Sequence, residues 1–351
     1  MKIESIDLLG RPVGPRHPCF VIAEAGINHN GDPEMALKLV DAAARVGAEA
    51  VKFQTFRAEQ VVSAYAPKAE YQVETTGENE TQLEMAKKLE LSYADFERIK
   101  AHCDVRGITF LSTPFDEESA DFLENLGVPA FKIPSGEIVN PAFLEHVARK
   151  GKPLLVSTGM SSLGEVDEAV RIIRQTGNKQ FVLLHCVSSY PAEASSANLR
   201  AMTTMREAFQ VPVGYSDHTQ GIEVPLAAVA LGACVIEKHF TLDRDLRGPD
   251  HRASADENEF AVLLKAIRRV EESLGHGRKE PALCEAEIAR VARRSLVAAR
   301  AISSGTILTR DLIAVKRPGT GIAPRLLSAV LGRKAAVNID KETVITWEML
   351  V

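Results

Sequence analysis

The chain has 351 residues, of which 45% are hydrophobic and 25% charged, an ordinary balance for a globular protein. Its formal net charge of -5 leaves no basic footprint, so we exclude nucleic acid as the main partner. Five scattered cysteines without a C-x-x-C pair, and an N-terminus without the apolar core of a signal peptide, predict a cytoplasmic protein. The longest apolar run, 224–236, is too short to span a bilayer, so we expect no membrane partner.

Eight short apolar runs alternate with helical patterns between residues 19 and 240. Eight parallel strands are the number that closes a barrel, so the pattern predicts an α/β fold of the (β/α)8 TIM-barrel type. A doubly wound open sheet is the alternative, but no strong G-x-G-x-x-G turn follows the first run. The runs cover residues 19–25, 50–55, 108–113, 130–135, 153–158, 181–187, 211–216 and 233–240.

Helix start and stop signals separate these runs. Asp32 and Asn140 each precede a proline, as an N-cap precedes the first helical residue, and Gly47 and Gly107 stand where helices should end. The connection 57–91 is too long for an ordinary loop and contains the polar stretch TTGENETQ. We expect it to be a lid or binding loop at the barrel mouth, with a disordered surface excursion as the alternative.

The chain changes character after a helical pattern at 257–274. We assign residues 1–275 to the barrel domain and the polar, proline-containing segment 276–290 to a linker. Beyond it, a pattern of alanine, isoleucine and threonine positions that starts at Ala298 recurs from Ala335, with an offset of 37 throughout. Residues 291–351 are therefore expected to form a compact domain with internal two-fold symmetry, too small for a large core of its own.

Two of the apolar runs end on a histidine beside acidic residues. These are His218 and His239, and the 14 residues from 221 to 234 between them suit one helix. Both imidazoles would then lie at the same ends of neighbouring parallel strands, where such barrels do chemistry. Two neutral imidazoles would make an incomplete metal site with positions open to water and substrate. Alternatively, each histidine caps a helix or satisfies a buried carbonyl.

The other strand ends also carry polar side chains. Lys52 and Lys132, with hydroxyls from several strands, describe a pocket for phosphate or carboxylate. A strand lysine can instead snorkel to the surface, and a serine there can be a turn residue. The agreement across most of the strands favours the pocket, whose candidate residues are Glu24, Lys52, Gln54, Thr113, Lys132, Ser135, Glu137, Ser157, Ser188, Tyr190, Ser216 and Glu237.

Seven ordered motifs resemble those of the sialic acid synthase family. They are FVIAEAGINHNG at 20–31, VKFQ at 51–54, STPF at 112–115, KIPSGE at 132–137, STGM at 157–160, SDHT at 216–219 and EKHF at 237–240. The resemblance covers nearly the whole chain. It implies a (β/α)8 barrel followed by a small antifreeze-like (SAF, β-clip type) domain. It also implies the condensation of phosphoenolpyruvate with an open-chain N-acetylhexosamine and water, giving a nine-carbon 2-keto acid and phosphate.

The resemblance also implies residue roles. His218 and His239 would hold a divalent metal, usually manganese, with magnesium or cobalt as alternatives. Glu137 would orient or deprotonate the water, in competition with the substrate phosphate, and the other catalytic residues would be Glu24, Lys52 and Glu237. Phosphoenolpyruvate would be bound by Lys52, Thr113, Lys132, Ser135, Ser157, Ser188 and Ser216, and the sugar by Glu24, Gln54, Tyr190, Asp250 and Arg317.

Two departures from the family pattern are visible. Ser188 stands where some members have asparagine, so its phosphate contact would run through water, and Pro134 replaces a frequent glycine. The family also implies a domain-swapped homodimer in which Arg317 reaches the sugar in trans.

The acceptor stays open between N-acetylmannosamine, its 6-phosphate and a 2,4-diacetamido-6-deoxy hexose. The GPDH motif at 248–251 leans towards a neuraminate or N,N'-diacetyllegionaminate synthase, for example in surface or spore-coat polysaccharide synthesis, rather than a pseudaminate synthase. Two further interpretations are an ice- or carbohydrate-binding module on an inactive barrel, and a related keto acid synthase with another metal or none.

Overall fold

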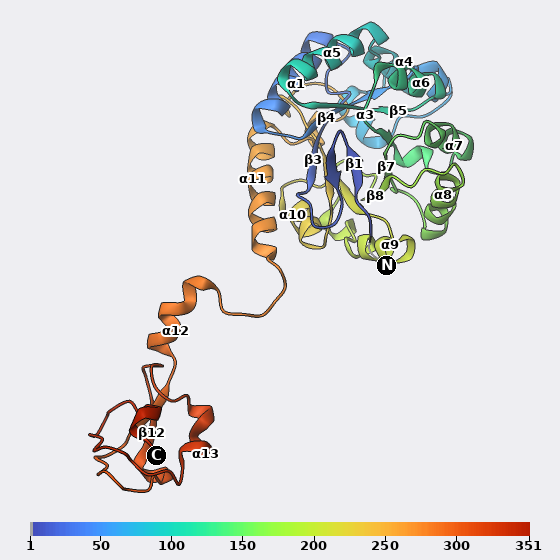
Figure 1. Cartoon of the computed structure of the whole chain (residues 1–351). Helices are drawn as coiled ribbons and strands as arrows, with labels where there is room; N and C mark the ends of the chain where they lie inside the picture. Colours follow the sequence, from blue (N-terminus) through green and yellow to red (C-terminus); the bar gives the residue numbers. More distant parts are fainter. Residues whose placement is uncertain (1–2) are drawn as a thin grey trace. The chain divides into compact units, whose positions relative to one another are not determined.

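The computed structural model describes residues 3–351, which form two compact units, one up to Gly275 and the other His276–Val351 (Figure 1). Each unit has a core of its own. None of the helices in the described part of the chain combines the length and the apolar content that a membrane span requires.

Eight parallel strands of the first unit form a nearly closed barrel. Their order around the sheet is β5-β4-β3-β10-β9-β8-β7-β6, and β5 also contacts β6. The first barrel strand pairs with the last, from Val235 beside Phe20 to His239 beside Glu24, so the sheet curls onto itself. The predicted TIM barrel is therefore confirmed and the open sheet is rejected. The strands are β3 (Phe20–Gly26), β4 (Ala50–Thr55), β5 (Thr109–Pro114), β6 (Phe131–Ile133), β7 (Leu154–Ser157), β8 (Phe181–Cys186), β9 (Val213–Asp217) and β10 (Val235–His239).

Helices between the strands surround the barrel (Figure 1). The predicted N-caps are present, because Asp32 accepts a hydrogen bond from the Glu34 amide and Asn140 from the Phe143 amide. Gly47 and Gly107 end their helices in the left-handed conformation, as predicted. The helices are α1 (Pro33–Val46), α5 (Tyr93–Arg106), α6 (Glu117–Leu126), α7 (Pro141–Arg149), α8 (Leu163–Gln175), α9 (Arg200–Phe209), α10 (Glu223–Ala230) and α11 (Glu257–Leu274).

The long connection between β4 and α5 folds into three short helices, α2 (Ala58–Val61), α3 (Glu70–Thr76) and α4 (Gln82–Leu89). Met85 and Leu89 of α4 pack against Ile27 and Phe56, which follow the C-terminal ends of β3 and β4. Gly31 lies so close to the Lys88 carbonyl that an added Cβ would meet the oxygen at 2.2 Å. The connection is thus anchored at the end of the barrel where the strands finish.

The opposite end of the barrel is plugged by a hairpin that the sequence interpretation missed. Strands β1 (Ile6–Leu8) and β2 (Arg11–Val13) pair antiparallel, and Ile6, Leu8 and Val13 are buried in the cluster that fills the barrel interior. Two three-residue strands are too short to show a clear alternation.

The second unit shows the predicted internal repeat in its contacts. Strands β11 (Ser295–Ala298) and β12 (Ile313–Lys316) pair antiparallel. Ile302 and Ile339, equivalent positions of the repeat, exchange two backbone hydrogen bonds of 2.8 Å, as residues related by a local two-fold axis do. The 3-10 turns Arg310–Leu312 and Trp347–Met349 are likewise equivalent. The segment predicted as a linker also contains the beginning of a helix, α12 (Ala286–Ala292), and α13 (Leu327–Val330) lies further on.

Candidate active site

Along each barrel strand, every second side chain points into the barrel interior. On β3 and β4, the apolar residues Ile22 and Ala50 belong to the interior cluster, and Glu24 and Lys52, two residues further on, face the same side. The same alternation applies to Thr113, Ser157, Ser216 and Glu237 on β5, β7, β9 and β10. The polar layer at the strand ends is therefore a direct continuation of the apolar layer beneath it.

Two lysines and two glutamates form a buried ion cluster at the centre of this layer. Lys52 Nζ lies 2.6 Å from Glu24 Oε2 and 3.7 Å from Glu237 Oε1, and it donates to Thr113 Oγ1 at 2.7 Å. Lys132 Nζ lies 3.6 Å from Glu237 Oε1, which also accepts a hydrogen bond of 3.2 Å from Ser216. The structure thus brings together six predicted site residues, including Thr113 and Ser216.

Burial sets the protonation of this cluster. It raises the pKa of Glu24 to about 7, against the opposing effect of Lys52. Burial also acts to raise the pKa of Glu237, but Lys132 and Lys52 outweigh it, so that pKa is lowered. The pKa of Lys132 is lowered by burial. Glu24 therefore exchanges a proton near neutral pH, and its protonation would leave excess positive charge for an anion.

A hydroxyl cradle adjoins the lysines. Ser135 Oγ accepts a hydrogen bond of 3.0 Å from the Gly159 amide. A Cβ on Gly159 would meet Ser135 Oγ at 2.7 Å and Ser188 Oγ at 2.3 Å, so only glycine leaves this space open. Ser157 Oγ is buried and has no hydrogen-bond partner among residues 3–351. The structure therefore places the hydroxyls of Ser135 and Ser188 side by side at Gly159, where they could donate hydrogen bonds to a phosphate or carboxylate oxygen.

The two histidines face each other with ring centroids 5.4 Å apart. His218 Nδ1 donates to the Val187 carbonyl at 2.7 Å, which leaves Nε2 as a free lone pair. His239 Nδ1 is buried without a hydrogen-bond partner in the described chain, and burial holds the pKa of His239 well below its usual value. His218 does satisfy a buried carbonyl, as the alternative interpretation held, but with one nitrogen only.

The donor set fits a divalent ion that shares its coordination with water and substrate. Within residues 3–351 no group of three or more His, Cys, Asp and Glu side chains is arranged around a metal position, so the protein would supply two imidazoles. Asp250 Oδ2 lies 3.8 Å from His239 Nδ1, and burial raises the pKa of Asp250 to about 6. Burial acts to lower the pKa of His218, but Cys186 and the Val187 carbonyl outweigh it and raise that pKa, so protons would compete with a metal there.

Of the predicted sugar residues, Tyr190 contacts both imidazoles. The ring of Tyr190 lies 4.2 Å from that of His218 and meets His239 edge-on at 5.6 Å. Gln54 Nε2 donates to Glu24 Oε1 at 3.3 Å.

Two predicted residues lie outside these contacts. Glu137 is half-buried in the 3-10 turn that follows β6, and its Oε2 accepts a hydrogen bond of 2.8 Å from Asn140, the N-cap of α7. Arg317 belongs to the second unit and is exposed there. Its turn is held by hydrogen bonds from the Gly319 amide to the Arg290 carbonyl and from Ser295 Oγ to the Pro318 carbonyl. The roles of Glu137 and Arg317 stay predictions.

Sequence reasoning missed a buried ion pair behind the histidines. Lys238 Nζ donates to Asp217 Oδ2 and to the Thr219 carbonyl, both at 2.6 Å. These residues precede His239 and His218, but their parity directs them away from the barrel interior. It also missed Tyr71 of α3, whose ring lies 5.2 Å from Tyr190. An aromatic residue in a connection predicted as a lid was the available signal.

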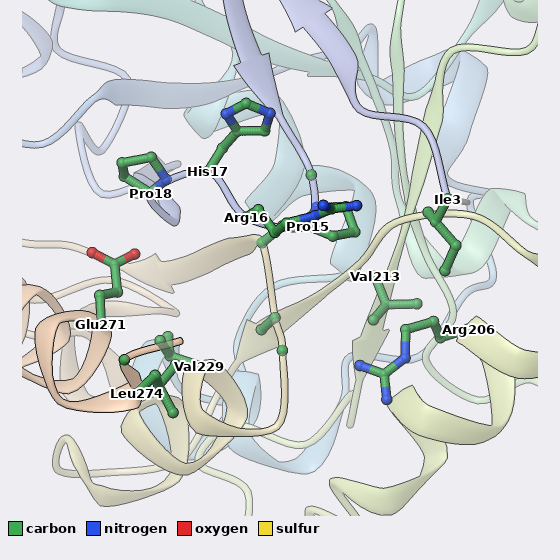
Figure 2. Close-up of a pocket in the computed structure, with 15 residues that line it drawn as sticks. Ile3, Pro15, Arg16, His17, Pro18, Arg206, Val213, Val229, Glu271 and Leu274 are labelled. Atoms are coloured by element: carbon green, nitrogen blue, oxygen red, sulfur yellow. The ribbon is translucent and has the colours of Figure 1, made fainter. Parts of the chain in front are cut away.

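A large cavity of about 810 Å³ opens at the other end of the barrel (Figure 2). Arg16, Arg206 and His17 lie at it together with apolar residues such as Val213 and Leu274. Val213 begins β9, so this cavity lies where the strands start. The convergent lysines, carboxylates and imidazoles are at the opposite ends of the strands, so we place the active site there despite the size of this cavity.

An eight-stranded barrel whose strand ends gather lysines, carboxylates, hydroxyls and an imidazole pair defines a barrel enzyme with an anion-binding site. Comparison with known proteins identifies the family. Residues 39–279 match the NeuB family, and residues 293–351 match the SAF domain. The chain therefore belongs to the NeuB family, the sialic acid synthases with a C-terminal SAF domain, and the predicted resemblance is confirmed.

Individual relatives are similar to this chain over nearly its full length. The N,N'-diacetyllegionaminic acid synthase of Legionella pneumophila is 48% identical over 342 residues, which cover 96% of this chain and 96% of that protein. The N-acetylneuraminate-9-phosphate synthase of Homo sapiens is 36% identical, and the match covers 97% of this chain and 95% of that protein. A crystal structure of N-acetylneuraminic acid synthetase from Leptospira borgpetersenii superposes with a TM-score of 0.73 at 39% identity, covering 82% of this chain and 95% of that one.

Proposed function

We propose that this enzyme condenses phosphoenolpyruvate with an open-chain N-acetylhexosamine and water, giving a nine-carbon 2-keto sugar acid and phosphate. One observation carries the proposal. The same ring of strand ends holds a lysine and hydroxyl site suited to a phosphate with a neighbouring carboxylate, and an imidazole pair suited to a metal. The two half-sites meet at Glu237. Its carboxylate contacts both lysines, and its strand, β10, also carries His239.

The residues divide the chemistry between them. Lys52 and Lys132 neutralise the phosphate and carboxylate of phosphoenolpyruvate. Ser135 and Ser157 donate hydrogen bonds to their oxygens, and Ser188 does so through a water molecule. His218 and His239 would hold a divalent ion, which we propose is manganese, and this ion would act as a Lewis acid on the sugar aldehyde.

A carbon-carbon bond then forms between C3 of phosphoenolpyruvate and C1 of the sugar, as the C2–C3 double bond opens and the aldehyde oxygen becomes a hydroxyl by taking up a proton. Water adds at C2 as Glu137 takes its proton. The bond between C2 and the phosphate oxygen then breaks, so that phosphate leaves and C2 becomes the keto carbon.

Within this class we favour a 2,4-diacetamido-6-deoxy hexose as the acceptor. The supporting observation is that two relatives, at 48% and 46% identity to this chain, both carry the name N,N'-diacetyllegionaminic acid synthase. The N-acetylneuraminate-9-phosphate synthase is 36% identical. N-acetylmannosamine and its 6-phosphate are the competing acceptors.

Phosphate release tests the proposal. Release should require both phosphoenolpyruvate and an acceptor, stop after chelation and return with manganese. His239→Ala should abolish turnover and the binding of micromolar manganese, because one imidazole cannot hold the ion against water. His102→Ala is the matched control, since His102 bonds Asp41 on the outer helices. Unchanged manganese binding in His239→Ala would contradict the assignment of the metal ligands. Phosphate release without an acceptor would contradict the condensation.

A further inference from the structure

A stack of three rings joins the long β4–α5 connection to the imidazole pair. Tyr71 of α3 lies against Tyr190, with centroids 5.2 Å apart and planes inclined by 32°, and Tyr190 lies on His218 at 4.2 Å. Offset aromatic contacts of this kind are worth about 0.5–1.5 kcal/mol beyond the area they bury. Tyr71 is therefore in contact with a side chain that touches the centre of the site.

The hydroxyl of Tyr71 is available as a donor. Gln72 Nε2 donates to it at 3.4 Å, so its own proton is free for another acceptor. Burial, reinforced by the Asp250 carboxylate, raises the pKa of Tyr71 and keeps the group protonated. Asp250 is 5% exposed, and no hydrogen bond reaches its carboxylate from residues 3–351. Tyr71, Tyr190 and Asp250 thus offer two donors and one acceptor near the imidazole pair, as a polyhydroxylated chain requires.

The groups beneath this stack are closed off from solvent. Lys52 and Glu24 are 2% exposed, and His218 and His239 are 6% exposed. A substrate that binds these groups needs an opening, so part of the cover must move.

The contacts of the connection indicate which part moves. In α4, Met85, Ala86 and Leu89 are fully buried, whereas every residue of α3 keeps part of its surface exposed. Helix α3 is therefore the weakly held part, and the Tyr71 stack is a contact that it makes with the barrel.

We propose that Tyr71 is a positioning residue for the acceptor sugar, which closes α3 over the site by stacking on Tyr190 and donates its hydroxyl to the bound sugar beside Asp250. The sugar contact rests on the proposed function. The closure of α3 does not, because it depends only on contacts within the chain.

Steady-state kinetics of phosphate release test the sugar contact. Tyr71→Ala loses the stack and the donor, so the acceptor KM should rise about tenfold or more, with the phosphoenolpyruvate KM within about twofold of wild type. Tyr71→Phe keeps the stack and should raise the acceptor KM only about threefold. Tyr65→Ala is the control, because Tyr65 lies on the same connection and is 96% exposed. An acceptor KM in Tyr71→Ala equal to that of Tyr65→Ala overturns the contact, and so does an equal rise in both KM values.

Limited trypsin digestion tests the closure without any substrate. The side chain of Lys68 is 4% exposed, and its Nζ bonds Thr76 Oγ1 at 2.9 Å and the Gly77 carbonyl at 2.5 Å, at the end of α3. Opening of α3 frees this bond, so cleavage after Lys68, identified by mass spectrometry, should be about tenfold faster in Tyr71→Ala than in wild type or Tyr65→Ala.

Equal cleavage rates overturn the closure. If wild type releases no phosphate with any acceptor, the proposed function and the sugar contact fail together, and the digestion alone decides the closure of α3.

Discussion

Glu24 and Glu237 share the two buried lysines unequally. Glu237 contacts Lys52, Lys132 and Ser216, whereas Glu24 contacts Lys52 and accepts a hydrogen bond from Gln54. Burial disfavours the ionised form of both carboxylates, and the charge of Glu237 further disfavours ionisation of Glu24, which has fewer lysine contacts to offset these effects. Together they raise the pKa of Glu24 to about 7.

This titration predicts a pH dependence of stability. A carboxyl group with a raised pKa binds its proton more tightly in the folded state, so its contribution is full below about pH 4.5 and is lost as the pH rises through about 7. The loss is at most about 3 kcal/mol. Between pH 5 and 8 the unfolding free energy of wild type should fall relative to that of Glu24→Gln. Circular dichroism is the suitable probe, because the single tryptophan, Trp347, lies in the second unit. Parallel curves for the two proteins would contradict the assigned pKa.

Glu137→Gln keeps the side-chain shape and removes the base. Turnover should fall about a hundredfold or more, with little change in the KM for phosphoenolpyruvate, since Glu137 is not one of the lysine partners. Asn140→Ser is the control variant. It removes the hydrogen bond to the Glu137 carboxylate but keeps that carboxylate and an N-cap for α7. A collapse of phosphoenolpyruvate affinity in Glu137→Gln would instead assign Glu137 a structural role and leave water activation to the substrate phosphate.

Much of the site could be predicted because the alternation of inward and outward side chains along a strand can be read from a short stretch of sequence. Glu24, Lys52, Lys132 and Glu237 stand at the ends of recognisable strands, and a barrel directs such residues to one place. The hydrogen bond between Glu137 and Asn140 and the stack of Tyr71 on Tyr190 could not be predicted in this way. They depend on rotamers and on how a long connection packs, which no periodicity records.

At the scale of elements, the β9–β10 ladder places two polar side-chain pairs on opposite faces. Ser216 pairs with Glu237 and Asp217 with Lys238 in the register. The first pair faces the barrel interior and belongs to the site. The second faces outwards and is buried, with Lys238 also bonded to the Thr219 carbonyl. We infer that this outer pair holds the two histidine-bearing strand ends in register.

Breaking the outer pair should be costly. Asp217→Asn and Lys238→Met should each lower the unfolding free energy of the first unit by about 3–5 kcal/mol, because each leaves a buried charge unpaired. The double variant should lose clearly less than the sum of the two, since it leaves neither charge. Urea unfolding followed by circular dichroism measures all three. Additive losses would show that Asp217 and Lys238 act independently.

The elements themselves were predicted to within a few residues where the chain alternates clearly. Residues 50–55 match β4 at both ends, and the strand predicted at 130–135 shortens to β6 because Pro134 cannot donate to a ladder. The hairpin β1–β2 and helix α12 were missed. A pair of three-residue strands and a seven-residue helix are set by packing against the rest of their unit more than by their own pattern.

On the scale of the whole molecule, we propose a homodimer that exchanges its SAF domains. The motivating observation is that Arg317 sits in a turn fastened to Ser295 and to the helix that holds Arg290, so the turn presents one fixed surface. A two-fold arrangement would use each such interface twice. Arg317 of the partner subunit would then contact the sugar.

Complementation between inactive variants tests the exchange. Arg317→Ala and His239→Ala should each be nearly inactive alone. Equal mixing and reassembly gives heterodimers as about half the population, each with one intact composite site, so about a quarter of wild-type activity should return. If no activity returns although mass spectrometry shows subunit exchange, the SAF domain acts in cis or not at all.

The central claim is the condensation itself, and product mass tests it most directly. Incubation with phosphoenolpyruvate, manganese and each of N-acetylmannosamine, its 6-phosphate and a 2,4-diacetamido-6-deoxy hexose, followed by mass spectrometry, reports both the reaction and the acceptor. We predict a product whose mass is the sum of the acceptor and pyruvic acid, formed with one equivalent of phosphate and fastest with the diacetamido sugar. Phosphate release that yields only free pyruvate with all three acceptors would contradict the account.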